Sequence, residues 1–259
     1  MLDATIARMK ALIVANWKMN PSSLKEAKKL FEATKKAATV AKGVSVIVAP
    51  PSIFLRDISA PTRGGKVGLA AQNVHYEAGG AFTGEISVPQ VRDAKAAYVI
   101  VGHAERRATG ETNDDTRRKV AAVLAVKMKP ILCIGEKTRG STSAEHLLFV
   151  REQLLVGLAD VPLAKLSKLI IAYEPVWAIG APKPMQPRDM HEMSIYIKKV
   201  LVEKFGETGM NATILYGGAV DATNAAHMLR EGDVKGFLVG RASVDAQGFT
   251  ELLRAAAAA

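Results

Sequence analysis

The sequence predicts an α/β fold of one domain, a closed (β/α)8 barrel. Eight short runs rich in β-branched residues alternate with stretches of helical spacing along the chain. Several of the short runs are continuously apolar, as in Tyr98–Val101 and Ile131–Ile134. Such runs suit parallel strands that are covered on both faces. No shift in composition divides the 259 residues, and a barrel of about this length ordinarily forms a single domain.

Each run and each helical stretch can be given approximate bounds. The predicted strands are Ala11–Asn16, Val44–Ala49, Lys66–Asn73, Ala97–Gly102, Pro130–Gly135, Leu169–Glu174, Ala212–Gly217 and Gly236–Gly240. The predicted helices are Ser23–Lys42, Asn113–Lys127, Ser143–Leu158, Arg188–Phe205 and Asp221–Arg230. Thr112 and Asp115 have the spacing of a capping box that opens the second of these helices.

An open, doubly wound sheet is the alternative architecture. It would need a topological switch point, and no Gly-x-Gly-x-x-Gly opens a helix after the first strand. We therefore expect the barrel domain to span residues 9–254, after an extension of residues 1–8. The low-complexity tail Ala255–Ala259 either extends the last helix or frays.

Composition limits the cellular setting. Hydrophobic residues make up 49% of the chain, but no run approaches the roughly 18 apolar residues of a membrane helix. The amino terminus lacks the pattern of a signal peptide, and the single cysteine, Cys133, cannot form an intramolecular disulfide. These observations predict a cytoplasmic protein with no membrane partner.

The net charge of +10 raises the question of nucleic-acid binding. The basic residues are scattered through helical stretches, as in Lys25–Lys29 and Arg117–Lys119. No zinc-finger spacing, aromatic RNA-binding motif or long basic run accompanies them. We expect a solvated surface and no nucleic-acid partner.

Chemistry-bearing residues follow several predicted strands. Lys18 follows the first, His103 the fourth and Glu174 ends the sixth, while Gly217-Gly218 and Gly240 end the last two. Alone, each charged residue has an ordinary explanation as a loop lysine, a structural histidine or an ion-pair glutamate. Active sites of such barrels lie at the carboxyl ends of the strands. Their joint placement therefore favours one shared site.

These groups suit proton transfer next to a carbonyl. A carboxylate such as Glu174 can remove the proton once water is excluded. His103 can donate a hydrogen bond to the developing enediolate, and Lys18 supplies fixed positive charge. A helix after the fourth strand would favour neutral imidazole at His103, and glycine-rich turns offer N–H groups to a phosphate. The chemistry requires no metal and no cofactor.

At these residues the sequence resembles the triosephosphate isomerase family, over essentially all of Met9–Leu253. The matching segments are Asn16-Trp17-Lys18-Met19-Asn20, Ala71-Gln72-Asn73, Gly80-Ala81-Phe82-Thr83-Gly84-Glu85, Gly102-His103, Glu105-Arg106-Arg107, Cys133-Ile134-Gly135-Glu136, Ala172-Tyr173-Glu174-Pro175-Val176-Trp177-Ala178-Ile179-Gly180 and Tyr216-Gly217-Gly218.

The resemblance implies a role for each matched site residue. It makes Glu174 the catalytic base, His103 the neutral electrophile and Lys18 the group that stabilises developing charge. Asn16 would bind a substrate oxygen, and two residues would support the others, Glu105 by pairing with Lys18 and Cys133 by packing behind the glutamate. The implied phosphate-binding residues are Gly180, Ala219, Gly240 and Arg241.

The resemblance also implies the reaction and the assembly. The expected activity is the interconversion of dihydroxyacetone phosphate and D-glyceraldehyde 3-phosphate through an enediolate, in glycolysis and gluconeogenesis. Residues 175–185 would form a lid over the phosphate. The Gln72–Glu85 segment would dock into a second subunit, with Thr83 reaching its active site, which implies a homodimer.

The sequence departs from the family pattern at four places. Ala104 stands where the family has a serine that holds the base at rest. Pro182 in the lid and Ala219 after Gly218 remove the two halves of one closing hydrogen bond. Arg241 replaces a glycine in the phosphate turn, where its side chain reaches either an anion or solvent.

The sequence is also compatible with two other functions. The departures allow a related barrel isomerase that acts on a tetrulose phosphate. A non-catalytic barrel is a second alternative, although such a protein would be expected to have lost Glu174, His103 or Lys18, and all three are present.

Overall fold

The computed structural model describes residues 11–59, 67–139, 144–179 and 184–259. The strands are β1 (Ala11–Asn16), β2 (Val44–Ala49), β3 (Val67–Ala71), β4 (Tyr98–Val101), β5 (Lys129–Ile134), β6 (Ile170–Tyr173), β7 (Thr213–Tyr216) and β8 (Gly236–Val239). All eight predicted strands are confirmed. Four of them, β4, β6, β7 and β8, are one or two residues shorter than the sequence pattern indicates, and β3 is three residues shorter.

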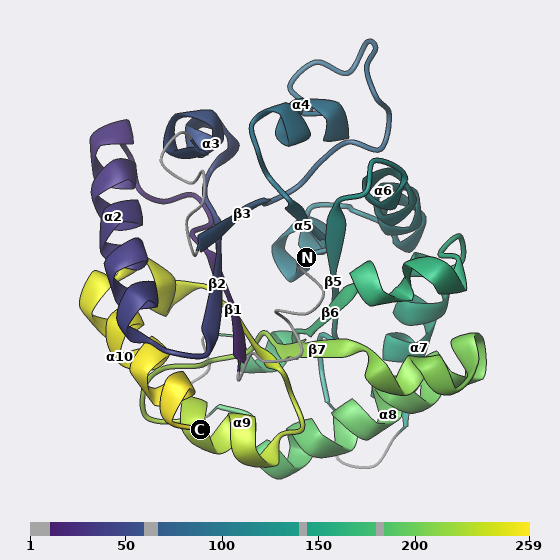
Figure 1. Cartoon of the computed structure of the whole chain (residues 1–259). Helices are drawn as coiled ribbons and strands as arrows, with labels where there is room; N and C mark the ends of the chain where they lie inside the picture. Colours follow the sequence, from purple (N-terminus) through teal and green to yellow (C-terminus); the bar gives the residue numbers. More distant parts are fainter. Residues whose placement is uncertain (1–10, 60–66, 140–143, 180–183) are drawn as a thin grey trace.

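The eight strands form one closed parallel barrel in chain order (Figure 1). The first strand pairs with the last, with Leu12 opposite Gly236 and Ala15 opposite Val239. An open doubly wound sheet would leave β1 and β8 unpaired with each other, so the closed barrel is the correct alternative.

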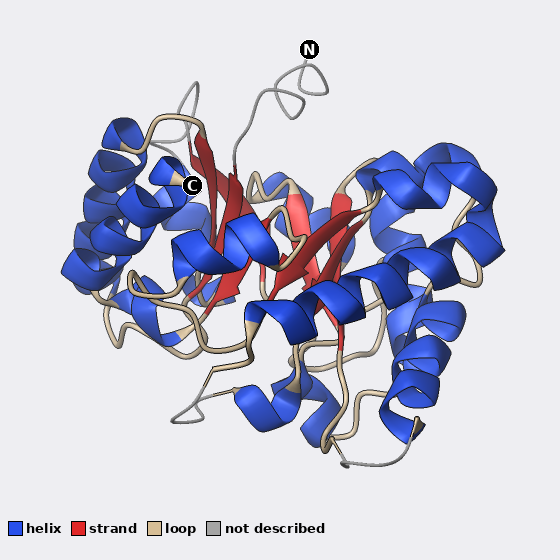
Figure 2. Cartoon of the chain, turned by 90° about the horizontal axis from the view of Figure 1, so that it is seen from below, coloured by secondary structure: helices blue, strands red, loops and turns tan. Residues whose placement is uncertain are grey.

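Helices surround the strands on the outside (Figure 2). They are α2 (Leu24–Val40), α3 (Ser52–Ser59), α4 (Val88–Asp93), α5 (Ala104–Ala108), α6 (Asn113–Ala125), α7 (Glu145–Gly157), α8 (Pro187–Phe205), α9 (Ala225–Glu231) and α10 (Ala246–Ala258), with short 3-10 helices η2 (Leu163–Lys168), η3 (Val176–Ala178), η4 (Gly206–Asn211) and η5 (Arg241–Val244). The predicted capping box is confirmed, since Thr112 and Asp115 exchange side-chain hydrogen bonds at the start of α6. Within the described ranges, no helix is both long and apolar enough to cross a membrane.

The sequence pattern gave no bounds for α3, α4, α5 and α10, three of which are eight residues or shorter. A helix after the fourth strand and a last helix before the alanine tail were nevertheless expected, and α5 and α10 occupy these places. The pattern also placed the start of the helix at 221–230 too early. The Asp221 carboxylate accepts hydrogen bonds from the N–H and hydroxyl of Thr223. This local bonding holds a turn, so α9 begins only at Ala225.

The core has two layers separated by the strands. Alternate strand residues such as Val14, Ile100 and Leu215 fill the inside of the barrel. The residues between them, such as Ile13 and Ala15, pack outward against the helices. Because the interior is filled with apolar side chains, polar chemistry is confined to the ends of the strands.

The carboxyl-terminal alanines belong to this packing. The helix α10 runs to Ala258 and lies beside α2 (Figure 1). Ala256 is fully buried, so the tail extends the last helix, the first of the two outcomes expected for it. The predicted extension of residues 1–8 lies outside the described residues.

Closure of the barrel depends on a backbone position that suits only glycine. Gly236 has φ +147°, and a Cβ atom there would lie 1.8 Å from the Leu12 carbonyl oxygen. We expect Gly236→Ala to lower the free energy of unfolding by more than the roughly 1–3 kcal/mol of a strained backbone conformation, because the clash adds to the strain. Urea unfolding followed by circular dichroism measures this.

The control is Gly68→Ala in β3, where the added Cβ would make only ordinary contacts, at 3.5 Å from Ile47 and Tyr98. Equal stability of the two variants would show that closure does not require a glycine at position 236.

Candidate functional site

A cavity of about 440 Å³ opens at the carboxyl ends of the strands. Its lining comes from the ends of β1, β4, β6, β7 and β8 and the loops after them. The lining residues are Asn16, Lys18, His103, Glu174, Ile179, Pro184, Gly217, Gly218, Ala219, Val220, Asp221, Asn224, Leu238, Val239, Gly240, Arg241, Ala242 and Asp245. Seven predicted site residues, from Asn16 to Arg241, therefore share one cavity.

Glu174 and His103 form a close acid–base pair in this cavity. The Glu174 Oε1 atom lies 3.3 Å from His103 Nε2, and both residues are buried. His103 caps α5, and its Nδ1 accepts the backbone N–H of Glu105 at 3.2 Å. A nitrogen that accepts a hydrogen bond carries no proton, so the proton of this imidazole is on Nε2. The expected neutral histidine, aimed by a helix start, agrees with this geometry.

The second oxygen of Glu174 is held by the backbone. Its Oε2 accepts the N–H of Ala104 at 3.1 Å. The family serine is absent at this position, yet the backbone of the same residue restrains the carboxylate. Glu174 therefore remains restrained at this position even though the serine hydroxyl of the family is missing.

Glu174 fits closely against two glycines, where a larger residue would clash with it. A Cβ atom on Gly217 would lie 2.6 Å from Glu174 Cγ, and one on Gly135 would lie 1.8 Å from the Glu174 carbonyl oxygen. Cys133 is fully buried behind the carboxylate. Burial, and then the negative charge of Glu174, raise the pKa of the Cys133 thiol well above its usual range. The thiol therefore stays neutral beside the base.

Lys18 is fixed by three neighbours. Its backbone is left-handed, with φ 53°, and its N–H donates to Asn16 Oδ1 at 3.1 Å. Its carbonyl accepts a hydrogen bond from Gln72 Nε2 at 2.8 Å. The ammonium group lies 2.5 Å from Glu105 Oε1. Both side chains of this pair are substantially exposed, so its role is to orient the lysine more than to stabilise the fold.

The last two strands end in turns that face the cavity. Gly217, Gly218 and Ala219 follow β7, and Gly240 and Arg241 follow β8. Arg241 is not among the residues with positive φ, so replacement of glycine there keeps the backbone N–H without strain. The buried Ser243 hydroxyl donates to the carbonyls of Gly240, at 2.6 Å, and Asn16, at 3.2 Å. This hydroxyl ties the last strand end to the first.

The segment after β6 is anchored at its start. The carboxylate of Glu136, which is buried, accepts Trp177 Nε1–H at 2.8 Å and the Tyr173 hydroxyl at 2.9 Å. Burial raises the pKa of the Tyr216 hydroxyl to about 12. The predicted phosphate ligand Gly180 and the lid departure Pro182 lie outside the described residues.

Sequence reasoning missed several residues that build the site. Gln72 was matched only as part of a segment, yet its amide bonds the carbonyls of both Lys18 and Ala49. Ser243 and Gln153, which accepts the Gly135 N–H at 2.7 Å, gave no signal. Each acts on backbone groups distant in the chain, which no local pattern encodes.

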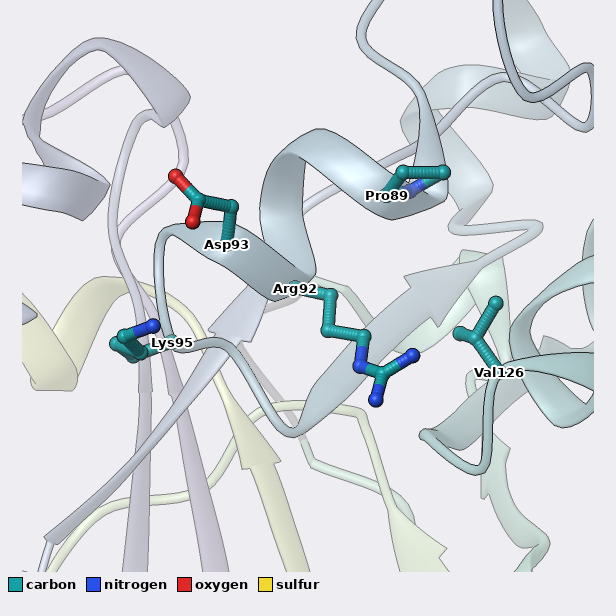
Figure 3. Close-up of a pocket in the computed structure, with 5 residues that line it drawn as sticks. All are labelled: Pro89, Arg92, Asp93, Lys95 and Val126. Carbon is teal, nitrogen blue, oxygen red and sulfur yellow. The ribbon is translucent and has the colours of Figure 1, made fainter.

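A second pocket, of about 340 Å³, lies away from this chemistry. Its lining residues are Pro89, Arg92, Asp93, Lys95 and Val126 (Figure 3). Lys95 precedes β4 and Val126 precedes β5, so this pocket faces the amino ends of the strands. It holds none of the predicted site residues.

Moving a proton between adjacent carbons needs a base and a hydrogen-bond donor in one cavity, and a carboxylate and an imidazole lie side by side in this one. The protein is a (β/α)8-barrel isomerase. More particularly, the chain belongs to the triosephosphate isomerase family, whose sequence model matches residues 11–256.

Individual relatives agree with this assignment. The chain is 39% identical over 246 residues to the triosephosphate isomerase of Endomicrobium trichonymphae, covering 95% of this chain and 98% of that one. It is 40% identical over 252 residues to that of Dehalococcoides mccartyi, covering 96% and 98%. It is 36% identical to that of Aquifex aeolicus, covering 95% and 99%. These names do not favour the tetrulose phosphate alternative.

The buried state of Cys133 has a measurable consequence. Its raised pKa keeps the thiol protonated at pH values where an exposed cysteine ionises, and the thiolate is the nucleophile that attacks thiol-specific reagents. At pH 9 we expect the folded protein to react with a thiol-specific chromogenic disulfide at least about tenfold more slowly than the urea-unfolded protein. Cys133 is the only cysteine, so the signal has one source. Equal rates would contradict the buried, neutral thiol.

Proposed function

We propose that the cavity interconverts dihydroxyacetone phosphate and D-glyceraldehyde 3-phosphate, with Glu174 as the base. The observation that carries this proposal is the pairing of a buried carboxylate with a neutral imidazole, 3.3 Å apart, on one cavity wall. The carboxylate takes the proton from the carbon next to the carbonyl. The electrons of that C–H bond form the carbon–carbon double bond of an enediolate while the π electrons of the carbonyl move to its oxygen. The hydroxyl proton on the deprotonated carbon then passes to this oxygen, the oxygen that loses it becomes the new carbonyl oxygen, and the Glu174 carboxyl group returns its proton to the former carbonyl carbon.

His103 and Lys18 act on the oxygens of the enediolate. The Nε2–H of His103 donates to them as negative charge develops, because its Nδ1 is occupied by the Glu105 N–H. Lys18 contributes fixed positive charge, and Glu105 holds its ammonium group in place at 2.5 Å. Asn16, which lines the same wall, binds a substrate oxygen.

The phosphate end is formed by backbone N–H groups. Ala219, Gly240 and Arg241 follow the last two strands at the cavity, and Gly180 completes the set as a further donor. Amide groups converging from turns suit an oxyanion. Residues 175–185 close over the bound phosphate, starting from the Trp177–Glu136 anchor, and exclude water during the proton transfer.

We further propose a cytoplasmic homodimer in which the Gln72–Glu85 segment docks into the second copy through residues 77–85. These residues are exposed in the single chain, although the segment is ordered by its own contacts. The His75 ring lies 4.2 Å from that of Phe82, and the Arg118 guanidinium lies 3.6 Å from the Tyr76 ring centroid. An ordered, exposed segment that carries Phe82 and Thr83 suits insertion into a neighbouring subunit.

Shortening the side chain of Glu174 tests its role as the catalytic base. Glu174→Asp withdraws the carboxylate from the reacting carbon, so we expect kcat to fall by about 100-fold or more with little change in KM. A coupled assay on glyceraldehyde 3-phosphate measures both constants. Glu207→Asp makes the same change at an exposed position and should leave both constants unaltered. A Glu174→Asp variant with the kcat of the wild type would show that Glu174 is not the base.

Restoring the family serine tests the backbone restraint on the base. Because the Ala104 N–H already holds Glu174 Oε2, we expect Ala104→Ser to change kcat by less than about tenfold, the effect of one modest hydrogen bond. The same coupled assay applies. A rise in turnover by several orders of magnitude would mean that the missing hydroxyl cripples the natural enzyme.

A further inference from the structure

Of the cationic side chains that the structure describes around the cavity, one is paired with a carboxylate and one is not. Among the described residues that line the cavity, the cationic side chains are Lys18 and Arg241. The charge of Lys18 is largely balanced by Glu105 at 2.5 Å. The Arg241 side chain is exposed and makes no ion pair or hydrogen bond with the described part of the chain.

Two carboxylates line the same end of the cavity, and both are engaged elsewhere. Asp221 accepts the N–H of Thr223 at 2.8 Å and its hydroxyl at 2.5 Å, and these hydrogen bonds lower the pKa of Asp221. Asp245 caps α10 by accepting the N–H of Gln247 at 3.1 Å. Neither carboxylate pairs with Arg241, so its positive charge remains available at the cavity.

The position of Arg241 in the chain directs it to the phosphate end. It follows Gly240 directly and begins η5, in the turn whose backbone is assigned to the phosphate. A guanidinium is permanently charged and presents paired N–H donors that match two oxygens of a phosphoryl group. Backbone amides bind any oxyanion, whereas a full charge adds a preference for the doubly charged phosphoryl group.

We propose that the Arg241 side chain is a specificity-determining residue, which binds the phosphoryl dianion of the substrate in addition to the backbone turn. This inference rests on the proposed function and extends it from the backbone of residue 241 to its guanidinium. Arg241 takes no part in the proton transfer, so its contribution falls on substrate capture.

Removal of the charge tests the proposal. We expect Arg241→Gln to raise KM for glyceraldehyde 3-phosphate by about tenfold and to change kcat by less than about threefold, since one charge-assisted hydrogen bond is lost from binding alone. Inhibition by inorganic phosphate should weaken by a similar factor. The activity on D-glyceraldehyde, which lacks the phosphate, should stay the same within about twofold. Arg241→Lys should recover part of the loss, because it keeps the charge without the paired donors.

The matched control is Arg254→Gln, which removes the same charge from an exposed position on α10 outside the cavity lining. Its constants should equal those of the natural enzyme. If Arg241→Gln and Arg254→Gln have the same KM and the same affinity for phosphate, the arginine side chain points into solvent and the inference is wrong. If the natural enzyme itself fails to isomerise the triose phosphates, the proposed function fails instead, and calorimetric titration with inorganic phosphate still reports on Arg241.

Discussion

The pairing of the first and last strands is the constraint on which the structure depends. Leu12 and Gly236 meet so closely that the position opposite Leu12 has no room for a side chain. Closure fills the barrel interior with apolar residues and leaves polar groups only at the strand ends. It also brings Asn16 and Lys18, near one end of the chain, to the same cavity as Gly240 and Arg241, near the other.

Within the closed barrel, the surroundings of Glu174 leave its side chain few ways to move. Gly135 and Gly217 admit its backbone and side chain closely, and the Ala104 N–H and His103 Nε2 meet its two oxygens. The neutral Cys133 thiol adds no opposing charge. A carboxylate held in this way faces an imidazole whose proton position is set by a helix N–H. The same short helix, α5, therefore serves both members of the acid–base pair through adjacent residues.

Much of this arrangement could be predicted from the sequence. Short β-rich runs, several of them continuously apolar, predicted all eight strands, and β1 and β2 match to the residue. Strand-end position, together with family resemblance, identified Asn16, Lys18, His103, Glu174, Ala219, Gly240 and Arg241, which the structure gathers around one cavity. The bounds of the short helices could not be predicted because α4 and α5 hold only six and five residues, fewer than two turns of apolar periodicity. The left-handed backbone of Lys18 and the Gln72 amide that supports it were equally invisible, because they depend on contacts between distant parts of the chain.

The Ser243 hydroxyl donates to the carbonyl of Gly240 in its own turn and, across a separation of 227 residues, to the carbonyl of Asn16. This single hydroxyl links the end of β1 to the turn after β8 at the rim of the cavity. A ribosome-bound fragment that ends before β8 therefore contains the acid–base residues but has no complete wall around them. The cavity is complete only with the eighth strand in place, because β8 closes the barrel and lines the cavity.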